Sequence, residues 1–337
     1  MNTLLESGLP LAAAPLAGGP TTVDLARAAA DAGAFAFMPA GYKTAAQLDD
    51  DLAAMEGLGR PFGVNLFVPQ PDHLDRAAFR AYAQEISPEA DALGVTVASD
   101  PTHDDDGWAA KVDLLLRRPV AVVSLTFGLP EAHSIADLQK VGSRVLATVT
   151  TVEEARTAHA AGVDGLVVQG PGAGGHSATF DPRRPVTGSS TVEVVTDVRG
   201  ATGLPVVAAG GVDGPASVRL LLDAGAESVA VGTLLLRSHE SGASRTHQDA
   251  LADPAFTETV VTHCFTGRPA RALRNGFYER HHAGAPYGYP DLHHLTRDLR
   301  RAAAASGDPH RLHLWAGTGY RSARVSPAAE ILTDLMS

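Results

Sequence analysis

The sequence predicts an α/β protein built as a closed (β/α)8 barrel with a smaller helical lobe. The first observation is a repeated pattern, an Ala-rich helix end followed by a glycine and a short apolar strand, at 29–37, 158–168 and 221–231. Helix–glycine–strand repeats indicate βα units and a mostly parallel sheet. The second is a set of short Val- and Ala-rich runs, typical of strands covered on both faces. These runs lie at 11–14, 35–38, 62–66, 120–124, 144–148, 164–168, 204–208 and 227–231. Eight units in about 250 residues fit a TIM barrel.

The alternative is an open, doubly wound sheet. It is disfavoured because the first strand leads to Ala14-Pro15-Leu16-Ala17-Gly18-Gly19 and not to a G-x-G-x-x-G turn. Helix starts agree with the barrel units. Thr151 and Glu154 have capping-box spacing, Thr21 and Asp24 repeat it in a looser form, and Asp213 is expected to cap the helix that begins near Pro215.

Two segments of the chain are additional to the eight βα units of a barrel. We expect residues 1–68 and 119–260 to form the barrel, and residues 69–118 and 261–337 to form a helical lobe over its mouth. The insertion 69–118 has room for two helices. In the tail, Leu292, Leu295 and Leu299 have helical spacing, and Gly307 is expected to end that helix.

Composition narrows the class of function. The formal net charge of −11 argues against a nucleic-acid-binding surface and favours a protein that acts on small molecules. The single cysteine, Cys264, allows no intrachain disulfide, is best read as a small buried hydrophobe, and suits the cytoplasm. Neither a signal peptide nor a membrane span is expected from the pattern of apolar residues.

The most informative segment is 169–176, which reads QGPGAGGH directly after a predicted strand. Its glycines let a flat or anionic ligand approach the backbone, and its histidine suits proton transfer near neutral pH. Catalytic groups of such barrels lie where strands end, so we expect His176 at the active-site edge.

Two further loops predict a phosphate site. Gly210-Gly211 and Gly232-Thr233 follow the seventh and eighth strands, where these barrels commonly bind phosphate through backbone amides. The plain alternative is that both are ordinary βα turns. Asn65 and Gln169 end other strands; each amide either satisfies local backbone or hydrogen-bonds a heteroaromatic ring such as the pyrimidine part of a flavin. A phosphate and two amides across one mouth fit FMN.

Several motifs together resemble the nitronate monooxygenases, formerly called 2-nitropropane dioxygenases. They include APLAGG at 14–19, GVNL at 63–66, the 169–176 loop, PVVAAGGV at 205–212, VGT at 231–233, FTGRPAR at 265–271 and WAGTG at 315–319. The resemblance spans nearly the whole chain and is weakest over 70–118 and 281–310.

The resemblance implies a fold, a cofactor and an activity. It implies an FMN-binding TIM barrel that oxidises alkyl nitronates, such as propionate 3-nitronate, with O2 to a carbonyl compound and nitrite or nitrate, without reduced nicotinamide. The active-site histidine of the family falls on His176. The flavin contacts are expected at Ala14, Asn65, Gln169, Gly174, Gly175, Gly210, Gly211, Gly232 and Thr233. In its cationic form His176 could pair with the nitro oxygens, and in its neutral form it could take a proton from a nitroalkane carbon.

The sequence departs from the family pattern at two places. Gly172 stands where glutamate is usual, and Ala178 where a second glycine is usual, so the resemblance specifies the cofactor more closely than the substrate. Two other functions remain open: an NAD(P)H-dependent FMN reductase resembling enoyl-ACP or quinone reductases, and a flavin-free phosphate-binding barrel. A homodimer formed through the insertion and tail is also open.

Other charged and aromatic residues have plainer interpretations. We expect His281, His282, His293 and His294 to be exposed loop histidines without a metal, and Asp104–Asp106 to be a solvated run. Arg268, Arg271 and Arg274 either face an anionic substrate or pair on the surface. Trp315 either covers the flavin or anchors the tail.

Overall fold

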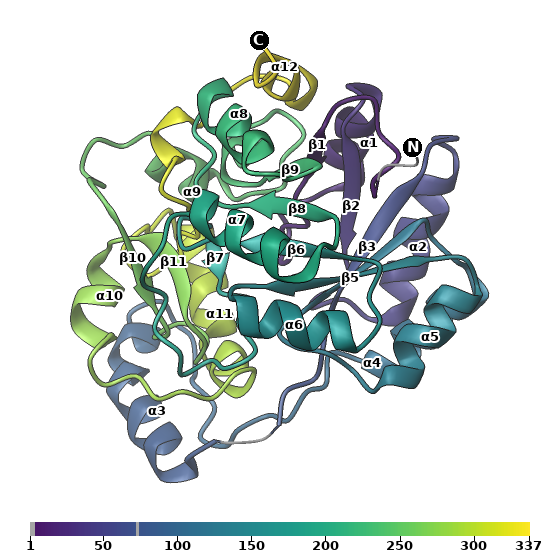
Figure 1. The fold of residues 1–337 in the computed structure, drawn as a ribbon. Helices are drawn as coiled ribbons and strands as arrows, with labels where there is room; N and C mark the ends of the chain where they lie inside the picture. Colours follow the sequence, from purple (N-terminus) through teal and green to yellow (C-terminus); the bar gives the residue numbers. More distant parts are fainter. Residues whose placement is uncertain (1–3, 72–73) are drawn as a thin grey trace.

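The computed structural model describes residues 4–71 and 74–337, and its centre is a closed barrel of eight parallel strands (Figure 1). The strands follow one another around the barrel in chain order, and the last pairs with the first, Leu11 beside Val229. The strands are β1 Leu11–Ala13, β2 Phe35–Pro39, β3 Phe62–Phe67, β4 Val122–Thr126, β5 Arg144–Val149, β6 Gly165–Gln169, β8 Val206–Ala209 and β9 Ser228–Val231. The predicted TIM barrel is confirmed, and the open sheet is wrong.

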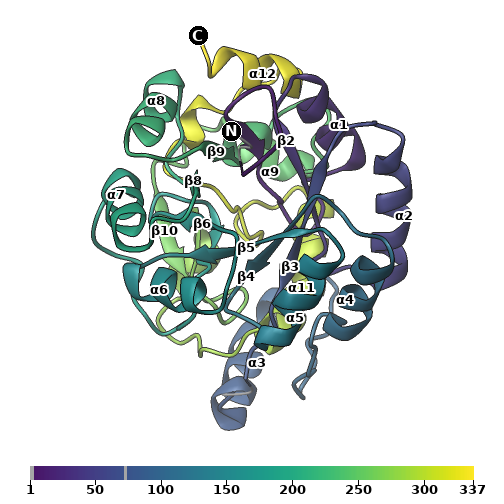
Figure 2. The same ribbon diagram turned by 45° about the vertical axis from the view of Figure 1, so that its right-hand side comes forward.

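Helices surround this barrel, as Figure 2 shows. Those that follow the strands are α1 Val23–Asp31, α2 Ala45–Glu56, α4 Trp108–Arg117, α5 Ala132–Lys140, α6 Val152–Ala160, α7 Thr191–Thr202 and α8 Pro215–Asp223. After β9 come the short 3-10 helix η1 Thr233–Leu235 and α9 Arg245–Ala250, and the last helix, α12 Ala328–Asp334, packs against α1 and η1. The C-terminus therefore returns to the barrel and completes its helical layer beside α1.

The barrel interior is filled by side chains. Phe35 and Phe37 of β2 pack edge to face with ring centroids 5.0 Å apart, among small and branched residues from the other strands. Gly63 on the neighbouring strand makes room for them, because a Cβ there would lie 2.5 Å from the Phe37 ring. The filled interior leaves the strand ends as the place for a ligand.

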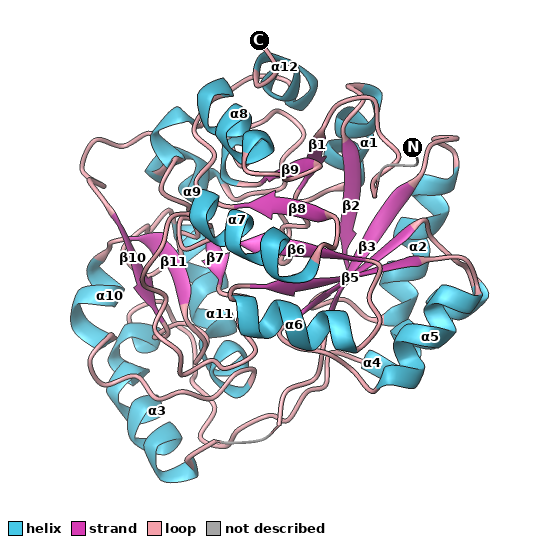
Figure 3. Ribbon diagram, in the orientation of Figure 1, coloured by secondary structure: helices cyan, strands magenta, loops and turns pink. Residues whose placement is uncertain are grey.

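A second unit lies at the mouth of the barrel, drawn at the lower left of Figure 3. It contains α3 Arg76–Asp91, α10 Gly276–His281, α11 Asp291–Ser306 and a sheet of β10 Thr259–Thr262, β11 Ala270–Leu273 and β7 Gly175–His176. The helix predicted from Leu292, Leu295 and Leu299 is confirmed as α11, which ends at Gly307 with φ 73°. Its apolar face packs on α3, with Phe79, Tyr82 and Ile86 among the buried partners.

The helices of the insertion and the tail do not all pack within the lobe. Of the two helices in the 69–118 insertion, α3 packs against α11, whereas α4 packs against α2 and α5 in the helical layer of the barrel. We therefore propose to place the lobe boundary before α4, and to assign α12 to the barrel.

Of the expected helix caps, one is confirmed and two are wrong. The Thr151 hydroxyl accepts from the backbone N–H of Glu154, as predicted. Thr22, and not Thr21, caps α1, because the Thr21 hydroxyl instead accepts from the N–H of Leu16. The N-cap of α8 is Gly214 in place of Asp213; the hydroxyl of Ser217 accepts from both of their N–H groups.

Candidate active site

His176 lies on a strand that belongs to the lobe sheet. The two-residue strand β7 pairs with β11 in antiparallel register, His176 beside Ala270. Gly175 precedes it with φ 75°, a left-handed conformation that suits glycine. The ring Nε2 lies 2.8 Å from the hydroxyl of Thr266. The backbone and the ring of His176 are thus both held by the segment that follows β10.

The surroundings of His176 are aromatic and positively charged. The rings of Phe127, Tyr289 and Trp315 lie with centroids 5.8, 5.5 and 5.4 Å from the imidazole. Burial, reinforced by the charges of Arg268 and Arg300, lowers the pKa of His176 from 6.5 to about 3. Of the two forms considered from the sequence, the geometry favours the neutral imidazole, which can accept a proton.

Gln169 ends β6, and its amide is used by local backbone. Its Nε2 donates to the carbonyl of His176 at 3.0 Å, and its Oε1 accepts from the N–H of Ala178 at 2.7 Å. The first of the two roles considered for this amide is the one observed. Gln169 therefore fixes the segment that carries His176.

Asn65 lies on β3, 4% exposed, with its amide nitrogen engaged by the neighbouring strand. Nδ2 donates to the hydroxyls of Ser124 and Thr126, each at 2.9 Å. Among the described residues, no donor reaches Oδ1 of Asn65. The amide is therefore held by β4 with its oxygen available to a ligand.

The loops after β8 and β9 present backbone donors. Gly210 and Gly211 have φ 104° and 82°, and the N–H groups of Gly211, Gly232 and Thr233 find no hydrogen-bond acceptor within the described part of the chain. The side chain of Thr233 is already engaged, since its Oγ1 accepts from the N–H of Gly317 at 2.9 Å. These are the loops in which the sequence predicts a phosphate.

The C-terminal segment 315–319 packs on the glycine loop after β6. A Cβ on Gly174 would lie 2.5 Å from the nitrogen of Gly317, so the two backbones touch. The departure at Gly172 has the same explanation: a Cβ there would lie 2.9 Å from Oγ1 of Thr318 and 3.1 Å from Cα of Gly211. The glutamate usual at this position could not enter unless these segments moved apart.

Ala14, the remaining expected contact, follows β1. Its N–H donates to the carbonyl of Val231 at 2.9 Å, and its Cβ lies beside Gly232, where a Cβ would be 3.5 Å away. Ala14 therefore belongs to the same rim as the loop after β9.

Two aromatic residues of the mouth have left-handed backbones that the sequence did not reveal. Tyr42, in the loop after β2, has φ 67°, and Phe127, after β4, has φ 79°. The Tyr42 ring stacks on His293 at 4.0 Å and its hydroxyl accepts from Tyr289 at 3.2 Å. The sequence signal for this turn was the dipeptide Gly41-Tyr42 at the end of β2. Glycine is needed at position 41, because a Cβ there would lie 2.2 Å from the Phe67 ring.

The expectation of exposed loop histidines is wrong, because none of the four is exposed and three of them lie in helices. His281 and His293 lie on α10 and α11, 6% and 7% exposed. His281 contacts Glu85 and Glu89 of α3 at 2.7 and 3.1 Å. No group of metal-binding side chains occurs among the described residues.

The acidic run 104–106 is not simply solvated. Asp106 pairs with the buried Lys111 at 2.6 Å and accepts from the N–H of Tyr42 at 2.7 Å. Asp104 pairs with His294 of α11 at 2.9 Å. The run therefore ties the lobe helix and the Tyr42 loop to the start of α4.

The arginines and the cysteine divide by burial. Arg268 is fully buried, with its guanidinium 4.0 Å from the centre of the Phe127 ring. Arg274 instead pairs on the surface with Glu258 and Glu279. Cys264 is buried, as expected, and burial raises the pKa of its thiol to about 12.

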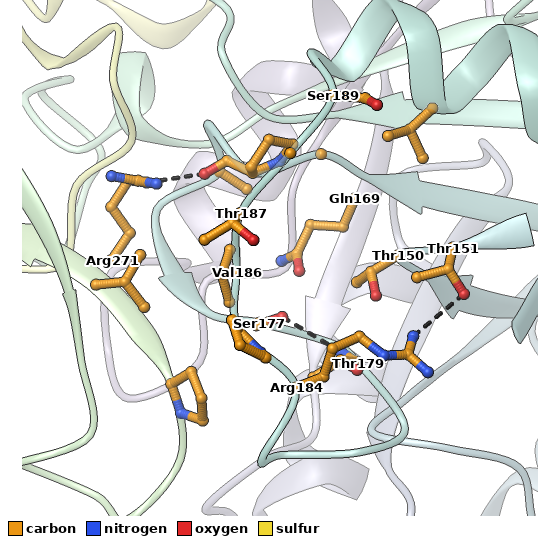
Figure 4. A pocket seen from close by; sticks show the side chains of 18 of the residues that line it. Thr150, Thr151, Gln169, Ser177, Thr179, Arg184, Val186, Thr187, Ser189 and Arg271 are labelled. Atoms are coloured by element: carbon orange, nitrogen blue, oxygen red, sulfur yellow. Dashed lines mark hydrogen bonds between the residues drawn. The ribbon is translucent and has the colours of Figure 1, made fainter.

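A pocket of about 270 Å³ lies on the side of the glycine loop that faces α6 and α7 (Figure 4). Gln169 lies between Thr150 and Thr187, and Arg184 and Arg271 lie on opposite sides. Gly175 and His176 also line it, so it adjoins the mouth residues from outside the barrel.

The geometry defines a class of protein: a TIM barrel with a buried histidine and a rim of free backbone donors at one mouth. A family model described as nitronate monooxygenase matches residues 3–337. The chain belongs to the nitronate monooxygenase family, and is an oxidoreductase of that type.

Individual relatives agree. A probable nitronate monooxygenase of Staphylococcus aureus (strain Newman) is 30% identical over 341 residues, covering 100% of this chain and 96% of the relative. A solved structure of nitroalkane oxidase from Streptomyces ansochromogenes is similar with TM-score 0.93 and 43% identity, covering 98% of this chain and 95% of that one. FabK from Thermotoga maritima, at TM-score 0.72 and 23% identity over 99% and 93% of the two chains, shares the fold.

None of the described helices combines the length and the apolar character that crossing a bilayer requires.

Proposed function

We propose that this protein oxidises alkyl nitronates with O2, using FMN bound at the mouth of the barrel. The observation that carries the proposal is the neutral His176 beside a rim of free backbone donors. Family membership and the likeness to a nitroalkane oxidase support a nitro compound as substrate.

The residues present fit FMN. The N–H groups of Gly211, Gly232 and Thr233 are donors suited to its phosphate. The available Oδ1 of Asn65 suits a ring N–H of the flavin. When bound, FMN supplies the electron acceptor and the reaction with O2.

The protein's own residues would bind the substrate and handle its proton. We assign the neutral imidazole of His176 as the acceptor of a proton from the carbon of a neutral nitroalkane; a nitronate has already lost that proton and needs no such base. Phe127, Tyr289 and Trp315 exclude water around the ring. Gln169 and Thr266 keep the imidazole in place.

The test is a visible spectrum of the purified protein, followed by anaerobic mixing with propionate 3-nitronate and, separately, with NADH. A yellow protein bleached by the nitronate supports the proposal. Bleaching by NADH alone would instead identify a reductase, and a colourless protein that takes up no FMN would contradict the cofactor.

A cytoplasmic location and a homodimer stay predictions. The single cysteine supports the first. Size-exclusion chromatography with light scattering tests the second.

A further inference from the structure

Two guanidinium groups near His176 are buried without a carboxylate. Arg268 is 0% exposed and Arg300 5%. Arg268 donates to the carbonyl of Ser177 at 3.0 Å and to that of Thr179. Neither arginine forms an ion pair with any acidic side chain in the described ranges. A buried charge is costly unless an opposite charge compensates it.

Arg300 is fixed by its own helix. Its Nε donates to Thr296 Oγ1 at 3.0 Å, and its Nη2 donates to the carbonyl of His293 at 2.9 Å and approaches the Nδ1 of that residue at 3.2 Å. Nη1 has no acceptor among the residues that the structure describes. The guanidinium is therefore oriented by α11 and retains an unused donor.

Side chains connect Arg300 to the mouth. His293, which Arg300 contacts, stacks on Tyr42 at 4.0 Å; the Tyr42 hydroxyl accepts from Tyr289 at 3.2 Å; and the Tyr289 ring lies 5.5 Å from His176. The rings of His293, Tyr42 and Tyr289 form an aromatic wall, and the guanidinium of Arg300 lies behind it. Its effect reaches the imidazole, because Arg268 and Arg300 both help to lower the pKa of His176.

Three acidic groups on α11 and on the segments that contact it are already compensated. Asp106 pairs with Lys111, Asp104 with His294, and Asp298 with Arg297 and Arg301 on the outer face of α11. The charges of Glu154 and Asp181 act on Arg268, so it is the charge of Arg300 that is left for a ligand.

We propose that Arg300 makes the mouth an anion-selective subsite, so that the site favours the anionic nitronate over the neutral nitroalkane and binds the product anion nitrite in competition with the substrate. The identity of these ligands rests on the proposed function. Arg300 acts as a positioning residue through the field at the mouth, not as a group that touches the reacting atoms.

The test compares R300Q, which removes the charge, with R300K, which keeps it, in the FMN-loaded enzyme. Ethyl nitronate and nitroethane are assayed separately, which is feasible because the neutral form ionises slowly. R300Q is expected to raise the KM for ethyl nitronate and the inhibition constant of nitrite about ten-fold or more, with a much smaller change in the KM for nitroethane. R300K is expected to restore both values. The matched control is R297Q, because Arg297 is exposed on the same helix.

Equal losses for both substrates in R300Q, or the same losses in R297Q, would overturn the proposal. If R300Q does not fold, the wild type still tests the proposal, because nitrite must then inhibit the turnover of the nitronate competitively. Absence of such inhibition would contradict it. A wild type that turns over no nitronate contradicts the proposed function alone. In that case, nitrite binding to wild type and R300K, followed by tryptophan fluorescence, tests the anion subsite separately, and no binding contradicts it.

Discussion

At the scale of single residues, the charge of His176 is set by its neighbours. The sequence identified this residue from its loop, but its charge depends on Arg268 and Arg300, which are 92 and 124 positions further along the chain. Burial and these two charges keep the imidazole neutral. The neutral state of His176 has a consequence for activity, and that of a second buried histidine, His247, has one for acid stability.

We predict that His176→Asn retains FMN but lowers turnover of neutral nitroethane by about 100-fold, the usual scale for a general base. In the wild type, kcat/KM for nitroethane should stay level as the pH falls below 6.5, because the pKa of His176 is lowered to about 3. The pH profile and the absorbance of bound flavin are the measurements. Full activity of the variant would remove His176 from the mechanism.

Buried histidines also predict acid sensitivity. Burial lowers the pKa of His247 from 6.5 to about 4, although the carbonyl of Trp315 accepts from its ring and opposes the shift. The unfolded chain therefore binds more protons between these values, so the stability associated with neutral His247 is complete above pH 6.5 and is lost as the pH falls toward 4.

His247→Gln should accordingly weaken the decrease in Tm between pH 6.5 and pH 4. The exposed His239 provides the control, and H239Q should follow the wild type. Identical Tm profiles for all three proteins, measured by circular dichroism, would contradict the assignment.

At the scale of elements, three glycine-containing loops pack backbone to backbone. The loop after β6, the loop after β8 and the segment 315–319 approach so closely that side chains are excluded at several positions. The positions of these glycines were visible in the sequence. Their contact with one another was not, because it joins segments that are between 37 and 146 residues apart in the chain.

We predict that Gly174→Ala separates segment 315–319 from the loop, costs about 1–3 kcal/mol of stability and weakens retention of FMN. The control is Gly200→Ala inside α7, where nothing lies within 4 Å of an added Cβ. That substitution should stabilise the protein by about 0.5–1 kcal/mol. Urea unfolding and flavin release on dilution measure the two effects; a stable, flavin-retaining G174A would contradict the packing.

At the scale of the whole molecule, α3 is fastened to the tail through Glu89. This carboxylate is 7% exposed and binds Arg280, His281 and Arg311. Burial by itself would raise the pKa of Glu89, but hydrogen bonds from Arg280 and His281 lower it to about 2. The insertion and the tail thus form one lobe partly through charge.

Glu89→Gln should lower Tm by about 2 °C or more, because the carboxylate of Glu89 is buried and is shared by Arg280, His281 and Arg311. The comparison is Glu279→Gln, whose pair with Arg274 is exposed, so its loss should change Tm little. Equal Tm values for the two variants in thermal scans would show that Glu89 does not fasten the lobe.

The barrel was predictable from sequence because its strands are local patterns. Each helix–glycine–strand repeat encodes one unit, and all eight strands were found near their observed bounds. The family and the candidate rim followed from short motifs after those strands. The aromatic wall was not predictable, because Tyr42, Tyr289 and His293 meet only through tertiary packing. The same reason explains the errors at His281 and Asp106, whose partners lie on other elements.

The pairing of β7 with β11 has a consequence for how this protein can change shape. His176 hydrogen-bonds into the three-stranded sheet of the lobe, and Gln169 at the end of barrel strand β6 donates to its carbonyl. The imidazole is thus attached to both units, so a tilt of the lobe against the barrel would load one of these two attachments. A cross-link between α3 and α4 would be expected to hold the lobe and to leave the position of the imidazole unchanged.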